Sequence, residues 1–261
     1  MSSSSPLVAE GVFWRSEPDT FTLDAPGLAR IRVEHGEVLP AIPAPEAGPA
    51  EARLIARTLP QAAAWVQRGC LVLHAAGVVT PAGVVALAGH SAAGKSVLAA
   101  ALAQRGCPLL ADEVLAIELN DGGAPPLAHP GDAEVLLWRR AAERLGYDPA
   151  TLTPARAGLE RYWLPPLPSA DAPTPLARIY LLEVHGQPEV QVEWLRGRER
   201  ALALMRHSFN RRLAETPARR QQMLLQLAAL PKTVNVARLR RPEAGWSLDE
   251  VLAALDEPAP A

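Results

Sequence analysis

The hydrophobic residues in the first quarter of this chain follow two different spacings. Short apolar clusters within residues 11–38 alternate with polar residues and are separated by Pro, Asp and Gly, which predicts a small antiparallel meander. From 50 to 67 the apolar residues recur every three or four positions, which predicts helix. Pro60 indicates that this helix is kinked or divided in two. The Pro- and Ala-rich residues 39–49 are expected to form a linker.

Two nearly continuous apolar runs come next. Residues 71–79 and 84–88 have the length and β-branched content of buried strands, and Thr80–Gly83 between them predicts a hairpin turn. Beyond a glycine-containing loop, residues 97–105 are expected to form a short Ala- and Leu-rich helix. Residues 108–111 predict a further strand. Alternating strands and helices of this kind indicate an α/β fold.

The pattern is weaker in the second half of the chain. Residues 135–145 are expected to form a helix, and residues 149–171 mostly irregular structure. Two alternating runs, 178–184 and 189–194, predict strands that pair with each other. The remaining periodic stretches predict helices over 202–213, 218–230 and 247–255 and a strand over 233–239.

The composition of the 261 residues is that of an ordinary globular protein, with 49% hydrophobic and 21% charged residues. A net charge of −2 provides no field that would attract nucleic acid or an anionic membrane, so neither is an expected partner. No apolar run is long enough to span a bilayer, and Met1–Pro6 lack the features of a secretory signal. Cys70 and Cys107 have no metal-binding spacing and are expected to be buried thiols. We therefore expect a cytoplasmic protein, and a homo-oligomer remains open.

A loop with a distinctive sequence connects the strand at 84–88 to the helix at 97–105. Its eight residues are Gly89-His90-Ser91-Ala92-Ala93-Gly94-Lys95-Ser96. They match the G-x-x-x-x-G-K-[ST] pattern of phosphate-binding loops, in the strand–loop–helix context that this pattern requires. The glycines allow tight turns with inward N–H groups, and the first helical turn adds its own unpaired N–H groups. We expect these eight residues to bind the phosphates of ATP.

The last two residues of the loop carry the chemistry. Lys95 would place a compact positive charge on the β and γ phosphates, and the Ser96 hydroxyl would ligate Mg²⁺. Lys95 and Lys232 are the only lysines among the 26 basic residues, so lysine is kept where a planar guanidinium is a poor substitute. The alternative is an ordinary helix start in an Ala- and Gly-rich stretch.

Two acidic residues, Asp112 and Glu113, directly follow the strand at 108–111. Strand ends form the ligand crevice of an α/β sheet, so both should lie beside the phosphate loop. One carboxylate would complete the Mg²⁺ site with Ser96, and the other would accept a proton from an attacking hydroxyl. The alternative is a solvated acid pair at a strand end.

Other polar residues give weaker signals. His74 lies within an apolar run, which on its own favours a core histidine over a functional one. Arg161 stands in an otherwise apolar stretch from which it could reach a phosphate. Five arginines cluster in the predicted helices near the C-terminus and are expected to form a charged helix face. The alternative is a docking site for an acidic peptide or a phosphate. These residues are Arg206, Arg211, Arg212, Arg219 and Arg220.

Together these residues resemble a known family. Leu73-His74-Ala75, the loop from Gly89 to Ser96, Arg105-Gly106 and the segment from Leu109 to Val114 are similar to the catalytic core of HPr kinase/phosphorylase and its kinase-only relatives. The wider layout, with Leu137-Trp138 and Arg161-Tyr162-Trp163, resembles the HPr-kinase-related proteins of peptide-modification clusters. Some of those proteins phosphorylate a serine on a lasso-peptide precursor.

The resemblance implies a fold, a set of site residues and an activity. The fold would be an α/β P-loop kinase core of the HPr kinase and phosphoenolpyruvate carboxykinase type, with a mixed central sheet. The chain would form one kinase domain over 1–261, with 11–38 as a β-rich N-terminal subregion and 50–261 as the catalytic core. The implied catalytic residues are Asp112, Glu113 and His74, and the implied metal ligands are Ser96, Asp112 and Glu113. Since the family's first acid is retained, we expect Asp112 to be the base and Glu113 to share the metal.

The chain departs from the family at three points. Ala92 or Ala93 stands where the family usually has glycine, and Asp112-Glu113 replaces Asp-Asp. No glycine-rich signature for the phosphorylase half-reaction is evident. The sequence therefore predicts an ATP- and Mg²⁺-dependent kinase that phosphorylates a serine of a protein or peptide. The alternatives are a nucleotide-binding regulatory module without transfer and a small-molecule hydroxyl kinase.

Overall fold

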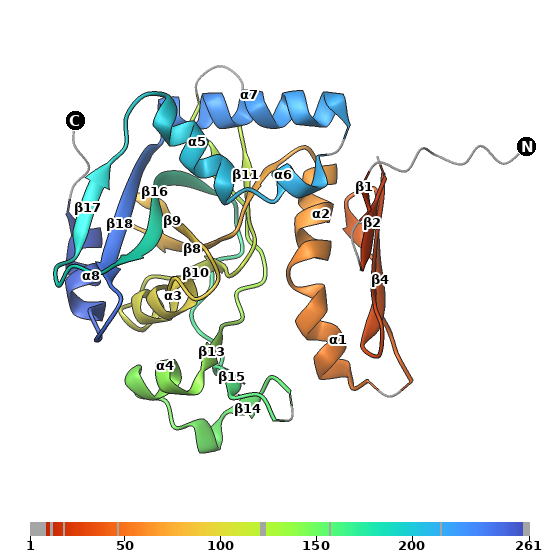
Figure 1. Ribbon diagram of the computed structural model, residues 1–261, viewed down its shortest axis with the longest axis horizontal. Helices are drawn as coiled ribbons and strands as arrows, with labels where there is room; N and C mark the ends of the chain where they lie inside the picture. Colours follow the sequence, from red (N-terminus) through yellow and green to blue (C-terminus); the bar gives the residue numbers. More distant parts are fainter. Residues whose placement is uncertain are drawn as a thin grey trace, which may run out of the picture.

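The computed structural model is shown in Figure 1. It describes residues 9–10, 13–17, 19–45, 47–120, 124–156, 158–214 and 216–257. The expectations for Met1–Pro6, Gly11 and Val12 fall outside these ranges.

Nine strands of the described chain form the largest sheet. They are β7 (Leu71–Leu73), β8 (Ala75–Thr80), β9 (Gly83–Gly89), β10 (Leu109–Ala111), β11 (Leu115–Glu118), β12 (Leu127–Ala128), β16 (Thr174–His185), β17 (Gln191–Trp194) and β18 (Asn235–Pro242). The order is β10-β8-β9-β16-β12-β11-β7, and β18 pairs with β16 and β17. Strands β9, β16 and β18 run parallel, whereas β8 and β17 run antiparallel to their partners. The expected mixed α/β sheet is confirmed.

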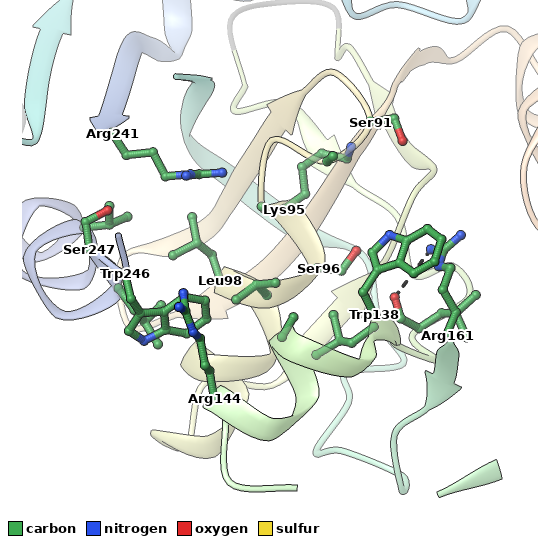
Figure 2. A pocket seen from close by; sticks show the side chains of 18 of the residues that line it. Ser91, Lys95, Ser96, Leu98, Trp138, Arg144, Arg161, Arg241, Trp246 and Ser247 are labelled. Carbon is green, nitrogen blue, oxygen red and sulfur yellow. Dashed lines mark hydrogen bonds between the residues drawn. The ribbon is translucent and has the colours of Figure 1, made fainter. Parts of the chain in front are cut away.

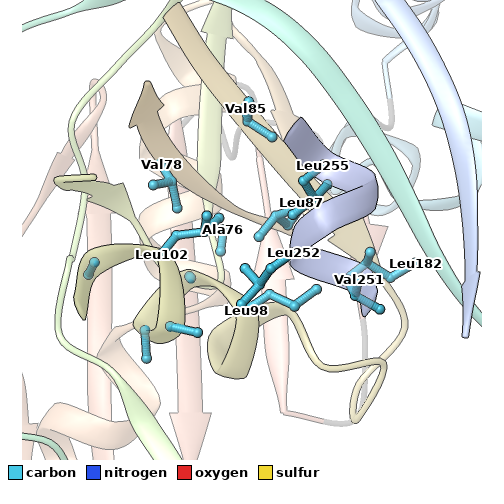
Figure 3. Packing of buried hydrophobic residues seen from close by; sticks show 14 of the residues in the cluster. Ala76, Val78, Val85, Leu87, Leu98, Leu102, Leu182, Val251, Leu252 and Leu255 are labelled. Carbon is cyan, nitrogen blue, oxygen red and sulfur yellow. The ribbon is translucent and has the colours of Figure 1, made fainter. Parts of the chain in front are cut away.

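Helices cover both faces of this sheet. On one face lie α3 (Lys95–Gln104) and α8 (Leu248–Asp256), and on the other α5 (Arg198–Arg206), α6 (Asn210–Leu213) and α7 (Pro217–Thr233). In β9, Val85 and Leu87 pack toward α3 and α8 (Figure 3), whereas Val84 and Ala86 pack toward α5 and α7. The near-continuous apolar sequence of β9 therefore reflects a strand that is buried on both sides.

A smaller antiparallel sheet precedes the main one. Its strands are β1 (Ala9–Glu10), β2 (Trp14–Ser16), β3 (Thr20–Ala25), β4 (Ala29–Glu34), β5 (Glu37–Val38) and β6 (Ile42–Pro43). The predicted meander is confirmed over its described residues. The predicted linker is partly wrong, because Ile42 pairs with Arg30 of β4.

Two helices connect this small sheet to the main one. They are α1 (Pro49–Ala56) and α2 (Leu59–Gln67), and Pro60 sits in the first turn of α2, so the proline divides the predicted helix in two. Phe21 and Ile31 of the small sheet share a core with α2 and with Val72 of β7. The small sheet is thereby packed onto the main sheet through α2.

Three element predictions are wrong in instructive ways. The run 71–79 is two strands: β7 pairs with β11 and β8 with β9, and His74 lies at the break between them. The predicted helix at 135–145 begins as β13 (Leu136–Trp138), and only α4 (Arg139–Arg144) is helical. The predicted pairing of 178–184 with 189–194 does not occur, because β18 lies between β16 and β17.

The segment expected to be mostly irregular also contains regular structure. A 3₁₀ turn at Pro149–Thr151 is followed by β14 (Thr153–Pro154) and β15 (Arg161–Trp163). Strand β13 pairs with β15, and β15 pairs with β14, in a three-stranded sheet. In this register Trp138 lies directly opposite Arg161.

None of the helices in the described ranges combines the length and apolar character needed to cross a bilayer.

Candidate active site

The loop from Gly89 to Ser96 connects the end of β9 to the start of α3 (Figure 2). A Cβ atom added at Gly89 would lie 3.0 Å from the carbonyl oxygen of Leu182 on the neighbouring strand, so this position excludes larger residues. Gly94 has a φ of 106°, a left-handed conformation that glycine adopts without strain, and α3 begins directly after it. Glycine is therefore required at position 89 by close packing and at position 94 by the backbone conformation.

Two residues other than glycine also adopt left-handed backbone conformations at this site. Ala92 in the loop has a φ of 65°, and Glu113 after β10 has a φ of 70°. Such conformations cost free energy and are concentrated at functional sites. Ala92 therefore occupies, with strain, a conformation that glycine would adopt freely.

The Lys95 side chain folds back over the loop. Its Nζ donates hydrogen bonds to the carbonyl oxygens of Gly89 and His90, each at 3.2 Å, and the side chain is buried. Burial lowers the pKa of Lys95, while Glu113 and Asp112 oppose that shift. The ammonium group is therefore held against the backbone where β9 ends and the loop begins.

Ser96, in the first turn of α3, meets Asp112, which directly follows β10. Ser96 Oγ donates to Asp112 Oδ1 at 3.0 Å, and Asp112 is only 2% exposed. Its other oxygen, Oδ2, is buried without a hydrogen-bond partner. Burial, with the charge of Glu113, raises the pKa of Asp112 to about 6. A buried carboxylate oxygen without a partner beside a serine hydroxyl suits a cation that is bound through oxygen.

Glu113 has a different environment, although it is the next residue. Its Oε2 lies 2.7 Å from His74 Nε2, and it lines the main cavity of the site. The hydrogen bond from His74 lowers the pKa of Glu113 to about 2. The break between β7 and β8 is fixed by a hydrogen bond from the His74 N–H to the carbonyl of His207. His74 is therefore not a core histidine but the partner of an acid at the cavity.

Two further histidines, His90 in the loop and His207 at the end of α5, pack against each other. The rings of His90 and His207 lie 5.1 Å apart, and Phe209 packs against the ring of His74 at 5.6 Å. Burial, with the nearby imidazoles of His90 and His74, lowers the pKa of His207 to about 4. His207 is thus a neutral spacer between α5 and the loop.

A cavity of about 360 Å³ extends along the loop, within the size range of small-molecule sites. It is lined by Ser91, Ala92, Gly94, Lys95, Ser96, Val97, Leu98, Glu113, Leu136, Leu137, Trp138, Ala141, Arg144, Arg161, Arg241, Gly245, Trp246, Ser247, Leu248 and Val251. Figure 2 shows Trp138 and Arg161 at one end, Trp246 and Arg144 at the other, and Lys95 and Ser96 between them.

Arg161 stacks on an aromatic ring and interacts electrostatically with Glu113 and Asp112. Its guanidinium lies 5.4 Å from the ring centroid of Trp138, and its Nε is buried without a hydrogen-bond partner. Burial lowers the pKa of Arg161, while the charges of Glu113 and Asp112 oppose that shift. This arginine can offer N–H donors to an anion held between the loop and the carboxylates.

The structure brings together the residues that the sequence singled out. From the loop and the acid pair, Ser91, Ala92, Gly94, Lys95, Ser96 and Glu113 line the cavity. Asp112 lies behind Ser96, and His74 behind Glu113. Gly89, His90 and Ala93 shape the loop from outside the cavity wall. The arginines considered as a dock, Arg206, Arg211, Arg212, Arg219 and Arg220, do not line it.

Four cavity residues are not among those that the sequence predicts for the site, and of these only Trp138 belongs to a segment with a family resemblance. Trp138, Arg144, Arg241 and Trp246 lie far from the loop in sequence. Arg241, at the end of β18, donates from Nε to the Ala93 carbonyl at 3.3 Å and so braces the loop. β16 separates β18 from the loop strand β9, so no local sequence pattern connects Arg241 to the loop.

The donor set fits a hard cation better than a transition metal. Within the described ranges, no group of three or more His, Cys, Asp or Glu side chains could hold a metal ion by itself. Mg²⁺ commonly takes one or two protein oxygens and completes its shell with phosphate and water. Ser96 and Asp112, whose side chains meet, match that requirement. Cys70 and Cys107 are both free thiols; Cys70 is buried as expected, whereas Cys107 is only partly buried.

Comparisons with known proteins find matches among solved structures only. No family model matches the chain, and no curated protein does. Among solved structures, the Hpr(Ser) kinase/phosphatase from Coxiella burnetii matches with a TM-score of 0.34 and 14% identity, over 70% of this chain and 86% of that one. A likeness at this level does not establish the family, so function must be inferred from the side chains of the site.

Proposed function

We propose that this protein is a Mg²⁺-dependent kinase that transfers the γ-phosphate of ATP to a serine hydroxyl of a protein or peptide. One observation carries the proposal. A loop with Lys95 and Ser96 at the start of a helix lies against an acid pair in which Asp112 contacts Ser96 and Glu113 contacts His74. This set provides phosphate binding, metal binding and a proton acceptor along one cavity, which are the requirements of phosphoryl transfer.

The loop would hold the phosphates. Backbone N–H groups of the loop and of the first turn of α3 surround the anion, and Lys95 supplies the positive charge. Lys95 already contacts the Gly89 and His90 carbonyls, so a small rotation of its flexible side chain would bring Nζ onto a phosphate. Arg161, across the cavity, would stabilise charge on the transferred group.

Ser96 and Asp112 would hold Mg²⁺, which neutralises phosphate charge when it is bound. The unpaired Oδ2 of Asp112 supports this role, because a carboxylate oxygen buried without a partner is costly. Burial also removes Asp112 from contact with an acceptor. The placement therefore favours Asp112 as the metal residue.

Glu113 would accept the proton. Glu113 lines the cavity, so its carboxylate would take the proton of the serine hydroxyl. His74 would orient this carboxylate through the 2.7 Å hydrogen bond, which also lowers the pKa of Glu113 to about 2. This assignment exchanges the roles expected for Asp112 and Glu113 on the basis of the resemblance.

The rim of the cavity supports a large acceptor. Trp138 is 52% exposed although it lines the cavity, so the end with Arg161 opens onto the surface. A closed pocket would suit a metabolite, whereas an open end next to the proton acceptor admits a serine on a peptide chain.

The test separates binding from chemistry. Single-turnover transfer from [γ-³²P]ATP to a library of serine peptides is measured for wild type, Asp112→Asn and Glu113→Gln, together with ATP affinity by calorimetry. We expect Glu113→Gln to keep ATP affinity and to lose about 10²- to 10⁴-fold in transfer rate. Asp112→Asn should in addition require more Mg²⁺.

A matched control is available elsewhere in the chain. Glu118 forms the same kind of contact with His129, at 2.8 Å, away from the cavity. Glu118→Gln should therefore leave both binding and transfer unchanged. Loss of transfer in Asp112→Asn alone would instead make Asp112 the base and Glu113 the metal ligand, as the resemblance implies. No transfer by wild type to any serine peptide would contradict the kinase proposal.

A further inference from the structure

We propose that Trp246, with Arg144 behind it, is the platform on which the nucleobase of the bound nucleotide stacks. This inference rests on the proposed function, because it assumes that the triphosphate lies on the loop. The cavity is lined by Lys95 and Ser96 at the loop, and it adds an aromatic ring, Trp246, beside Leu98, Arg144 and Ser247 (Figure 2). A nucleotide has the same two-part chemistry, with an anionic tail and a flat apolar ring.

Arg144 holds the Trp246 ring and the backbone next to it. The Arg144 guanidinium lies 5.0 Å from the centroid of the Trp246 ring, and Arg144 Nη1 donates to the carbonyl of Gly245 at 3.3 Å. Gly245 has a φ of 87°, so the chain turns sharply between β18 and α8 at the residue before the tryptophan. Arginine stacking covers one face of the indole and fixes its plane.

The surroundings of Trp246 suit a ring more than a phosphate. Leu98 of α3 lies near Trp246 in the cavity (Figure 2), and Ala141 of α4 and Val251 of α8 add further apolar lining. Trp246 is itself 40% exposed. A large aromatic side chain that stays exposed beside an apolar floor gains burial when a flat ligand stacks on it.

The other end of the cavity does not offer the same site. Trp138 is stacked with Arg161, but that arginine faces the charges of Glu113 and Asp112. A nucleobase placed there would turn the γ-phosphate away from Glu113, the proposed proton acceptor that lines the cavity. The direction of the nucleotide along the cavity follows: the base toward α8 and the γ-phosphate toward Glu113.

Stacking on an indole does not depend on the identity of the base, since every base has an aromatic face. We therefore expect ATP and GTP to bind with affinities that differ by less than about fivefold, in contrast to a site that reads base edges.

The experiment uses two probes that differ only in the nucleoside. Mg·ATP and Mg·tripolyphosphate are titrated calorimetrically into wild type, Trp246→Ala and Trp246→Phe. We expect Trp246→Ala to weaken ATP binding about tenfold or more, the loss of one stacking contact, and to leave tripolyphosphate binding unchanged. Trp246→Phe should retain most of the ATP affinity because it keeps an aromatic face.

A matched control tests whether any tryptophan–arginine pair would give the same result. Trp65 is stacked with Arg68 at 4.8 Å and does not line the cavity, so Trp65→Ala should leave the binding of both probes unchanged. Equal losses of both probes in Trp246→Ala, or no loss of ATP affinity, would overturn the platform while leaving the phosphate loop intact. Failure of wild type to bind either probe would overturn the proposed function and the platform together.

Discussion

The two ends of the cavity are built from similar parts but differ in their charge. Each end has a half-exposed tryptophan with an arginine stacked on it, Trp138 with Arg161 and Trp246 with Arg144. Arg161 has a buried Nε without a partner and lies in the field of the acid pair. Arg144 is exposed and donates to a backbone carbonyl.

The different charge environments of the two arginines suggest different roles for the two tryptophan–arginine pairs. A desolvated arginine near carboxylates and the loop can act on developing charge, where electrostatic interactions are strongest. A solvated arginine behind an indole contributes shape and modest affinity. We therefore assign transfer chemistry to the end with Arg161 and nucleoside binding to the end with Trp246.

The largest expected effect comes from the residue that serves both ends. Lys95→Ala should reduce phosphate transfer by about 10³-fold or more, because the loop loses its only mobile positive charge for the phosphates. Lys95→Arg should rescue little, since the buried site is shaped for a compact ammonium. Transfer assays at saturating peptide would measure both. Lys232 on α7, an exposed lysine, provides the control, and full activity in Lys95→Ala would refute the loop assignment.

The second prediction compares the two arginines directly. Arg161→Ala should lower the transfer rate about 10²-fold with little change in ATP affinity, as expected for a group that acts on the transition state. Arg144→Ala should instead weaken ATP binding a few-fold and leave the rate at saturating ATP unchanged. Steady-state kinetics with both substrates varied would check this. The comparison fails if the two variants share one kinetic pattern.

The third prediction concerns the metal. Ser96→Ala should raise the Mg²⁺ concentration needed for half-maximal transfer by about tenfold, because a ligand is lost while Asp112 remains. Ser96→Thr keeps the hydroxyl and should stay close to wild type. Mg²⁺ titrations of the transfer rate at fixed ATP would show an unchanged midpoint in Ser96→Ala if this residue has no part in metal binding.

The smallest expected effect is a pH dependence of stability on the side of the loop held by His207. Its pKa is lowered to about 4, so between pH 6.5 and 4 the unfolded chain binds a proton that the folded protein excludes. Stability from this group is therefore complete above pH 6.5 and decreases as the pH falls. At pH 5.5 the loss is about 1 kcal/mol.

Urea unfolding of wild type and His207→Gln at pH 7.5 and 5.5 would isolate this contribution. The raised pKa of Asp112 acts in the opposite direction but is common to both proteins, so it cancels in the comparison. The free energy of unfolding of wild type should fall more than that of the variant. An equal fall in both would contradict a buried neutral imidazole.

The parts of the site that could be predicted from the sequence are local. The loop, its lysine and serine, and the acids after the next strand lie within 24 residues of one another, from Gly89 to Asp112 and Glu113. Their arrangement depends on a strand, a turn and a helix whose signals are strong. The contact between Ser96 and Asp112 follows from that arrangement.

The parts that could not be predicted depend on long-range pairing. Trp246 reaches the cavity only because β18 pairs in parallel with β16, whereas the sequence pattern favoured β17 in that place. Trp138 lies opposite Arg161 through a three-residue strand too short for its period to be distinguished from a helix. His74 lies within an apolar run, and only the different partners of β7 and β8 reveal the break at which it lies.

A structure with a non-hydrolysable ATP analogue and Mg²⁺ would test the division of the cavity most directly. We predict that the triphosphate contacts the loop and Lys95, that the metal contacts Ser96 and Asp112, and that the base stacks on Trp246 with the γ-phosphate toward Glu113 and Arg161. A nucleotide bound in the reverse direction, with its base against Trp138, or one bound outside this cavity, would contradict the account.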